Sequence, residues 1–469
     1  MAAITQVSTK KKNKTKTKQK QNKIQTQIQN EIYYSISLWV KVLGKNTAPL
    51  KEENCAMIDS SISAENIESA ISWLAGFTEK PGEPGVTRPL YTKSWKQALF
   101  ALSQRFEKLG MTVEFDSVGN LIATVKGSEK PESVIACGSH IDTVSRGGRF
   151  DGQIGIVAAY LAVKNLLTRY GKPKKSLRII CLAEEEGSRF PYVFWGSKNF
   201  FGLAKKEDVE HICDSNGVPF ETAMREAGFN YQTTEPQFAN LEAWIELHIE
   251  QGPTLYSNHE DLGIITSIAG QHRWDIHLKG VQNHAGTTMM RYRHDAVDCM
   301  SHIVAKNLDK AKEAGDPLVL TFGRINVIPN QVNIVPGEVT FSMNCRHTDK
   351  AFLDQFLQEL DEDIHQTAES YGITATIDKW MSDDPTPLHN DIIQLLTNQA
   401  EKNGYEYRIM HSGAGQDTQI FAPFVKSGMI FVPSKDGISH APEEYTDPQD
   451  AVHGVKLLRD ALHSMAYEN

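Results

Sequence analysis

The chain has 469 residues, enough for two to four domains, and its 40% hydrophobic and 23% charged residues are typical of a globular protein. Residues 1–56 carry a charge of +8, so the rest of the chain carries −17 within a formal net charge of −9. This acidic body excludes nucleic acid as a partner, because phosphate binding needs a basic surface. No apolar run is long enough to span a bilayer, so we expect no membrane-spanning segment.

The first 56 residues and the cysteines indicate the cellular compartment of the protein. Residues 1–56 contain eleven lysines and no arginine, a composition that cannot build a core. We expect a disordered basic tail there, rather than a signal or transit peptide. The six cysteines form no CxxC pair, and Cys137 and Cys181 lie in apolar runs. Buried free thiols predict a reducing compartment and hence a cytoplasmic protein.

The globular pattern begins near Ser60 and alternates helices with strands. Helices are predicted at 65–77, 95–109 and 154–167, and strands at 112–115, 120–125, 133–137 and 177–182. Such alternation indicates a largely parallel sheet that is covered by helices on both faces.

The middle of the chain has a different pattern. Strands are predicted at 273–279, 318–322, 335–344 and 373–379, with helices at 294–314 and 350–370. The order β-α-β-β-α-β is that of a ferredoxin-like domain. After a linker at 382–387, a helix at 390–403, a strand at 429–432 and a helix at 450–464 resume the first pattern.

The fold class is therefore predicted to be α/β, with a mainly parallel sheet and an inserted ferredoxin-like domain. The predicted boundaries are the tail at 1–56, the first part of the catalytic domain at 57–270, the inserted domain at 271–379 and the second catalytic part at 380–469.

Polar clusters follow four of the apolar strand-like runs, at 138–142, 183–187, 246–250 and 437–440. Open α/β sheets bind ligands at the carboxyl ends of their strands. Four segments that each deliver His or Glu to this edge indicate a functional site.

His140 and Asp142 form a His-x-Asp pair. The imidazole could bind zinc, manganese or cobalt, and the carboxylate could fix its tautomer. Asp151 follows a glycine pair and could turn back toward His140. A loop with satisfied polar groups is the alternative, and it is favoured when this pair is taken alone.

Three consecutive acids, Glu184, Glu185 and Glu186, directly follow the buried run at 177–182. A two-metal hydrolase needs one carboxylate to bind metal and another to take a proton from water, and adjacent glutamates can divide these roles. A solvated acidic loop remains the alternative for Glu184, which receives no role.

The inserted domain carries His284 and Arg346. Arg346 could bind a substrate carboxylate through two parallel hydrogen bonds, or it could form a structural salt bridge. A lone His284 in a loop would ordinarily be a surface residue. The sequence has no Gly-x-Ser-x-Gly elbow, and residues 413–415 lack the spacing of a phosphate-binding loop, so these two chemistries are not expected.

Together and in this order, the segments resemble the amidase, hydantoinase and carbamoylase branch of the dinuclear zinc-dependent exopeptidase-like hydrolases, over residues 57–469. The run AEEEGSRFPYVFWGSKN at 183–199 is similar to the members that cleave allantoate. Shorter matches, which the branch shares more widely, are ELHIEQG at 246–252, NHAGTT at 283–288, LVLTFG at 318–323 and HSGAG at 411–415.

The resemblance implies a role for each matching residue. His140 and His248 match ligands of one metal, Glu186 and His440 match ligands of the second, and Asp151 matches the carboxylate that bridges both. Glu185 matches the general base. Asp142 is expected to contact His140 and fix its tautomer. The implied substrate-binding residues are His284, Asn333 and Arg346, with Gln251, Arg273, Gly413 and Ala414 as further candidates. Two positions depart from the allantoate pattern: Gln416 replaces a usual His, and Met289 a usual Pro.

The implied function is hydrolysis of a ureido C–N bond, with allantoate as the expected substrate and ammonia and carbon dioxide among the products. N-carbamoyl-L-amino acids and ureidoglycolate are alternative substrates, and a non-catalytic binding protein on this fold is a further alternative. Two divalent ions per chain are expected, as manganese or as zinc, cobalt or nickel. A homodimer is expected through the inserted domain, with His284 reaching the partner's metals.

Overall fold

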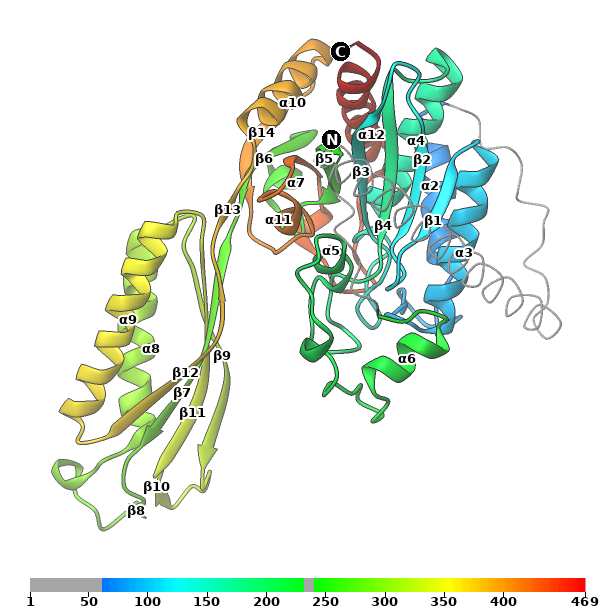
Figure 1. The fold of residues 1–469 in the computed structure, drawn as a ribbon. Helices are drawn as coiled ribbons and strands as arrows, with labels where there is room; N and C mark the ends of the chain where they lie inside the picture. The colour runs from blue at the N-terminus through cyan, green and yellow to red at the C-terminus, as the bar shows by residue number, and fades with distance from the viewer. Residues whose placement is uncertain (1–60, 232–239, 469) are drawn as a thin grey trace, which may run out of the picture. The chain divides into compact units, whose positions relative to one another are not determined.

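The computed structural model describes residues 61–231 and 240–468, so the predicted tail lies outside the described residues (Figure 1). The chain divides into two compact units. The first runs to Ile264 and continues through Asn390–Arg408 and from Pro423 onward. The second comprises Ile265–His389 and Ile409–Ala422, so it interrupts the first unit twice, where the sequence predicted one insertion.

The second interruption arises from hydrogen bonds that hold residues 409–422 to the second unit. The Ala269 amide donates to the Ser412 carbonyl over 2.9 Å, and Arg346 Nη1 donates to the Gly413 carbonyl over 2.7 Å. Gly413 and Ala414, which the predicted boundaries assign to the catalytic domain, therefore belong to the smaller unit.

The sheet of the first unit has a parallel centre. Its strand order is β1-β2-β4-β3-β5-β15-β6, in which β3–β4, β3–β5 and β5–β15 are parallel and the outer pairs are antiparallel. The strands are β1 (Thr112–Phe115), β2 (Leu121–Val125), β3 (Lys130–His140), β4 (Lys175–Leu182), β5 (Leu241–Ile249), β6 (Leu262–Ile268) and β15 (Lys426–Val432). The α/β fold with a mainly parallel sheet is confirmed.

Helices pack along this sheet from β1 to β15. Helix α4 packs on β3, β4 and β5, α12 packs on α4, β5 and β15, and α3 packs on β1 and β2 (Figure 1). The helices are α2 (Ala64–Ala75), α3 (Lys93–Lys108), α4 (Gln153–Tyr170), α5 (Trp195–Phe200), η2 (Lys206–Asp208), α6 (Phe220–Glu226), α7 (Thr254–Asn258), α10 (Asn390–Asn403), η4 (Lys435–Gly437), α12 (Pro448–His463) and η5 (Ser464–Glu468). No helix in the described ranges is long and apolar enough to cross a membrane.

The second unit has the predicted ferredoxin-like arrangement. Its antiparallel sheet has the order β12-β7-β11-β9, and α8 and α9 pack on it (Figure 1). The elements are β7 (Gly270–Lys279), β8 (Asn283–His284), η3 (Met290–Tyr292), α8 (Ala296–Ala314), β9 (Val319–Ile328), β10 (Ile334–Val335), β11 (Glu338–His347), α9 (Lys350–Ser370), β12 (Thr374–Asp383), β13 (Thr386–Pro387), β14 (Tyr407–Ser412) and α11 (Thr418–Phe421).

The two faces of this sheet differ. Trp274, Ile276 and Leu278 alternate along β7 and are buried in the core with the helices. The residues between them, such as Arg273, remain partly accessible. Because successive side chains of a strand point to opposite faces, the face without helices carries the polar residues.

Candidate metal centre and substrate-binding residues

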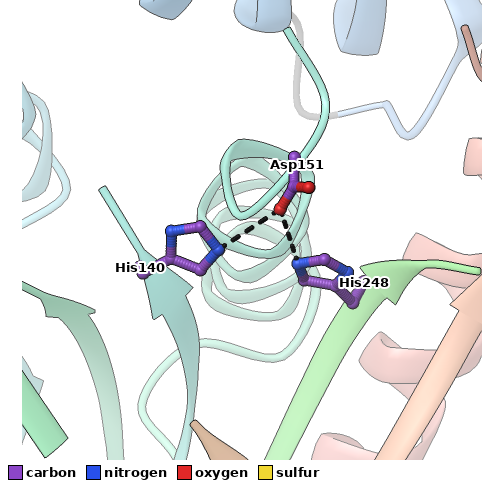
Figure 2. A group of neighbouring side chains, drawn as sticks. All are labelled: His140, Asp151 and His248. Carbon is purple, nitrogen blue, oxygen red and sulfur yellow. Dashed lines mark ion pairs between the residues drawn. The ribbon is translucent and has the colours of Figure 1, made fainter. Parts of the chain in front are cut away.

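Three segments bring His140, Asp151 and His248 together (Figure 2). His140 is the last residue of β3 and His248 lies in the neighbouring parallel strand β5, each two residues beyond the paired Gly138 and Glu246. Asp151 precedes α4, and its Oδ1 lies 3.4 Å from His140 Nε2 and 3.2 Å from His248 Nε2. Both histidines thus lie within strands, whereas the sequence placed their clusters just beyond the strand ends.

Gly152 allows this approach. It adopts φ +65°, which side chains disfavour, and a Cβ there would lie 2.5 Å from the His140 ring. Its amide donates to His248 Nε2 over 3.1 Å. Asp151 also lies at the amino end of α4, where the helix dipole stabilises a negative charge.

The other oxygen of Asp151 faces a second group. Asp151 Oδ2 lies 3.3 Å from His440 Nε2, which in turn lies 3.5 Å from Glu186 Oε1. Each carboxylate oxygen of Asp151 therefore faces a different cluster of donors.

Asp142 orients two parts of the site. Its Oδ1 lies 3.2 Å from His140 Nδ1 and accepts the Glu185 amide over 3.0 Å, while Oδ2 accepts the Glu186 amide. This leaves His140 Nε2 to face Asp151. Glu184 is buried and accepts the backbone amides of Gly187 and Trp195, so its role is structural.

The ionisable groups of the cluster shift one another's pKa values. Burial and the charge of Asp151 raise the pKa of Glu186 to about 8. Burial alone would lower the pKa of His140, but hydrogen bonds to Asp142 and Asp151 raise it well above its usual range. A bound cation would reduce the repulsion between the buried carboxylates. It would also take the place of the protons that the facing imidazoles otherwise carry.

The donor set fits two divalent ions. The groups His140, Asp151, His248 and Asp151, Glu186, His440 each place ligand atoms within 4.8 Å of one another. Donors that bind one ion at about 2.0–2.1 Å lie about 3.0–3.4 Å apart, close to the separations seen here. Imidazole and carboxylate together suit zinc, manganese, cobalt or nickel. Glu185 lies beside this centre, with a carboxylate oxygen within 4.8 Å of the ligand atoms of His140 and Glu186.

Three further side chains surround Asp151. Gln251 Nε2 donates to Asp151 Oδ2 over 2.8 Å, so the amide predicted to bind substrate contacts the carboxylate predicted to bridge the ions. Ser439 Oγ lies 3.0 Å from the same oxygen and 3.0 Å from Glu444 Oε2. The sequence assigned no role to Ser439, which lies in the predicted cluster at 437–440, and it missed Glu444, which lies four residues after His440.

In the second unit, Arg346 forms a cationic group with Arg273. When the side-chain amide of Gln271 is oriented with its oxygen toward the two guanidinium groups, that oxygen accepts from Arg346 Nη2 over 2.9 Å and from Arg273 Nε over 2.7 Å. Burial and the charge of Arg273 lower the pKa of Arg346. Within the described ranges no carboxylate forms an ion pair with either guanidinium, so of the two interpretations of Arg346 the structural salt bridge is absent there.

Open space adjoins this group. A Cβ at Gly413 would meet no atom within 4 Å, and the Gly413 carbonyl already accepts from Arg346. The Ala414 carbonyl accepts the Ser412 hydroxyl over 2.7 Å. Gln416, which stands where the allantoate pattern has a His, lies two residues after Ala414 and is buried.

His284 presents a defined tautomer. Its Nδ1 accepts the backbone amides of Gly286 over 3.0 Å and Thr287 over 3.2 Å, so the ring proton must be on Nε2. His284 lies opposite Ile334, next to Asn333, whose carbonyl accepts the Ala285 amide. His284 and Asn333 are both exposed, as is Met289, which stands where the allantoate pattern has a Pro.

Within this unit the two groups lie at opposite ends of the sheet. Arg346 pairs with Gln271 at one end of β7, and Glu338 pairs with Lys279 at the other. Eight residues of strand cover on the order of 25 Å. Strand β8 carries His284, and strand β10 begins directly after Asn333. Both strands lie beyond the Lys279 end of the sheet (Figure 1). A small molecule cannot contact Arg346 and His284 of one chain together.

Residues 136–464 match the peptidase family M20/M25/M40. The chain belongs to this family. It is 46% identical to the allantoate amidohydrolase of Escherichia coli (strain K12), with 86% of this chain and 98% of that protein covered. It is 41% identical to the allantoate amidohydrolase of Bacillus subtilis (strain 168), with 88% and 100% covered.

A solved structure supports the same family. An amidase of the hydantoinase/carbamoylase family from Burkholderia multivorans superposes with a TM-score of 0.81 at 28% identity, over 86% of this chain and 98% of that one. The predicted family and the predicted class of metal-dependent amidohydrolase are confirmed.

Proposed function

We propose that the protein hydrolyses a ureido C–N bond of allantoate, using two divalent ions that share Asp151. The observation that carries the proposal is that His140 and His248 face one oxygen of this carboxylate, while His440, with Glu186 beside it, faces the other. The choice of allantoate is supported by two relatives that have this activity in their names and are 46% and 41% identical to this chain.

The residues divide the work of hydrolysis. Two bound divalent ions would polarise the ureido carbonyl and lower the pKa of water. Glu185, beside the centre, accepts a proton from the attacking water and returns one to the departing nitrogen. The Nε2–H of His284 donates to the carbonyl oxygen, where negative charge develops.

The paired arginines supply recognition of the carboxylate. Arg346 has a planar fork of donors, and neither it nor Arg273 has an acidic partner among the described residues. A substrate carboxylate would supply that missing charge. Asn333 offers an amide that can hydrogen-bond a ureido group, although this alone does not separate allantoate from other ureido acids.

A homodimer follows if one substrate contacts both Arg346 and His284, because these lie too far apart within one chain. We propose that the second unit mediates this dimer and that His284 enters the partner's site. A mixture of inactive His284→Ala and inactive Glu185→Gln subunits should then recover activity, because hybrid dimers contain one intact site. Confirmed hybrids without recovery would contradict a shared site.

The native ion is proposed to be manganese and the compartment the cytoplasm. The imidazole and carboxylate ligands accept several ions, and availability selects among them. The five described cysteines are free, as expected in a reducing compartment.

The test of substrate is a panel assay. We would compare kcat/KM for allantoate, ureidoglycolate and N-carbamoyl-L-amino acids on one manganese-loaded preparation and follow ammonia release. Allantoate should be preferred. A tenfold preference for another ureido acid, about 1.4 kcal/mol, would contradict the substrate while leaving the metal chemistry standing.

A further inference from the structure

Glu444 connects two separate parts of the metal centre. It lies in the loop that follows β15, four residues after His440, and is only 4% exposed. Its Oε1 accepts the backbone amides of Phe150 over 2.8 Å and Asp151 over 3.1 Å. These residues precede it by 294 and 293 positions. The carboxylate therefore ties the loop that bears His440 to the backbone of the bridging residue.

The second oxygen of Glu444 makes another connection. Oε2 lies 3.0 Å from the Ser439 hydroxyl, which also lies 3.0 Å from Asp151 Oδ2. Ser439 directly precedes His440, so its position constrains that ligand. Asp151 is thus held through both its backbone and its side chain by groups on a single loop.

The loop between β3 and α4 has room for the Glu444 carboxylate only because residue 148 is a glycine. A Cβ at Gly148 would lie 1.9 Å from Glu444 Oε1, so any larger residue would displace the carboxylate. Space alone explains this glycine, because its φ lies outside the left-handed region.

The two halves of the centre depend on Glu444 to different degrees. His140 and His248 lie in adjacent strands of the sheet, and their position is set by the backbone pairing of β3 with β5. His440 lies on a loop, has φ +55° and leaves 49% of its side chain exposed. A non-glycine residue in this conformation costs energy and persists only when its surroundings fix it.

We infer that Glu444 is a positioning residue that sets the affinity of the metal site formed by Asp151, Glu186 and His440. This inference rests on the metal centre of the proposed function. Removal of Glu444 should weaken that site by the 10- to 100-fold typical of groups that orient metal ligands. The site of His140 and His248 should weaken less, because the pairing of β3 with β5 and the start of α4 also fix its ligands.

The test is metal content and Mn²⁺ titration of five single variants and one double variant, with thermal melting to confirm folding. Glu444→Ala should retain one ion per chain through dialysis, with the second bound 10- to 100-fold more weakly. Glu444→Gln should bind both ions nearly as wild type does, because its carbonyl can accept the same two amides and its NH₂ can meet Ser439. Gly148→Ala should behave as Glu444→Ala does.

Asp214→Ala is the matched control. The side chain of Asp214 is only 6% exposed, and its carboxylate accepts two backbone amides and one side-chain donor, Arg189, but none from a candidate ligand. This variant should bind both ions like the wild type even if it melts earlier. In a His440→Ala background, Glu444→Ala should cause no further loss of metal.

Two results would overturn the inference. One is wild-type affinity for both ions in Glu444→Ala, or an equal weakening of both sites there. The other is a Glu444→Gln variant that binds as poorly as Glu444→Ala, which would assign the effect to charge instead of position. Wild-type protein that binds fewer than two ions would instead overturn the proposed function.

Discussion

The candidate residues of the two units are held in different ways. His140, His248 and Asp151 are at most 5% exposed, and backbone pairing, a helix start and hydrogen bonds at the Nδ1 atoms of both histidines fix them. His284 is exposed in a two-residue strand, and Arg346 lies on the sheet face that carries no helix. The geometry of the group His140, Asp151 and His248 is therefore set by the fold itself, while recognition rests on surfaces that can change without disturbing it. Catalysis and specificity should accordingly respond separately to mutation.

Glu185→Gln should give the largest effect. Loss of the proton acceptor should lower kcat by roughly 10²–10⁴-fold, while the metal content stays at that of the wild type. Steady-state assays and metal analysis on one preparation would measure both. Glu184→Gln is the matched control, since Glu184 is buried and accepts the backbone amides of Gly187 and Trp195, and this variant should lower the melting temperature more than kcat. If Glu184→Gln lost more turnover, the role of base would move to Glu184.

Arg346→Ala should affect recognition alone. Loss of a charged hydrogen-bonding fork costs about 1.5–3 kcal/mol, so kcat/KM should fall roughly 10- to 100-fold, mainly through KM. Arg346→Lys should recover only part of this, because an ammonium lacks the planar fork. Arg324 is a useful control, because it lies on the same sheet and is already paired with Asp275. A fall in kcat with unchanged KM for Arg346→Ala would break the proposed separation.

Metal binding should depend on pH through the buried cluster. The hydrogen bond to Asp151 raises the pKa of His440 to about 9, so without metal its imidazole is protonated at pH 7.5. An imidazole ligand must be neutral and a carboxylate ligand ionised, and Glu186, with a pKa of about 8, is also largely protonated at pH 7.5. Binding should therefore release at least one proton, and affinity should rise at least about tenfold per pH unit until these groups have lost their protons. Calorimetry in buffers of different ionisation enthalpy would count the protons. Release of no proton at pH 7.5 would contradict the coupling.

Substitutions at Gln416 and Met289, the two positions that depart from the allantoate pattern, should have the smallest effect on activity. Gln416→His and Met289→Pro should each change the ratio of kcat/KM between allantoate and N-carbamoyl amino acids by less than tenfold, and should leave metal binding unchanged. Gln416 is buried beside the Gly413 loop and Met289 is 60% exposed, so neither lies in the ion-binding cluster. A larger change in either ratio would show that these positions determine specificity.

Local patterns predicted most of the fold. Apolar runs such as 177–182 and the β-α-β-β-α-β order were sufficient to predict the parallel sheet and the ferredoxin-like unit. Strand β14 (Tyr407–Ser412) was missed because its half-buried residues show no regular alternation. The inclusion of 409–422 in the second unit depends on tertiary contacts such as Arg346 to Gly413, which no local pattern reveals.

The candidate site was predicted to a similar extent. The five expected metal ligands come together because each follows a strand or lies in one, and the resemblance supplied their roles. Glu444 escaped notice because its partners lie nearly 300 residues earlier in the chain. The need for glycine at 148 and 152 also becomes apparent only from the atoms that a Cβ would meet.

The position of β15 has a consequence for how the protein is made. This strand, Lys426–Val432, lies between β5 and β6 in the sheet, although almost 180 residues of sequence separate it from β5. During synthesis, a contiguous ferredoxin-like segment leaves the ribosome before β15 exists, so it can fold while the larger sheet still has a gap. His440 then arrives last. Until the final strand inserts, β5 has an unpaired edge, the kind of surface on which chaperones act and aggregates begin.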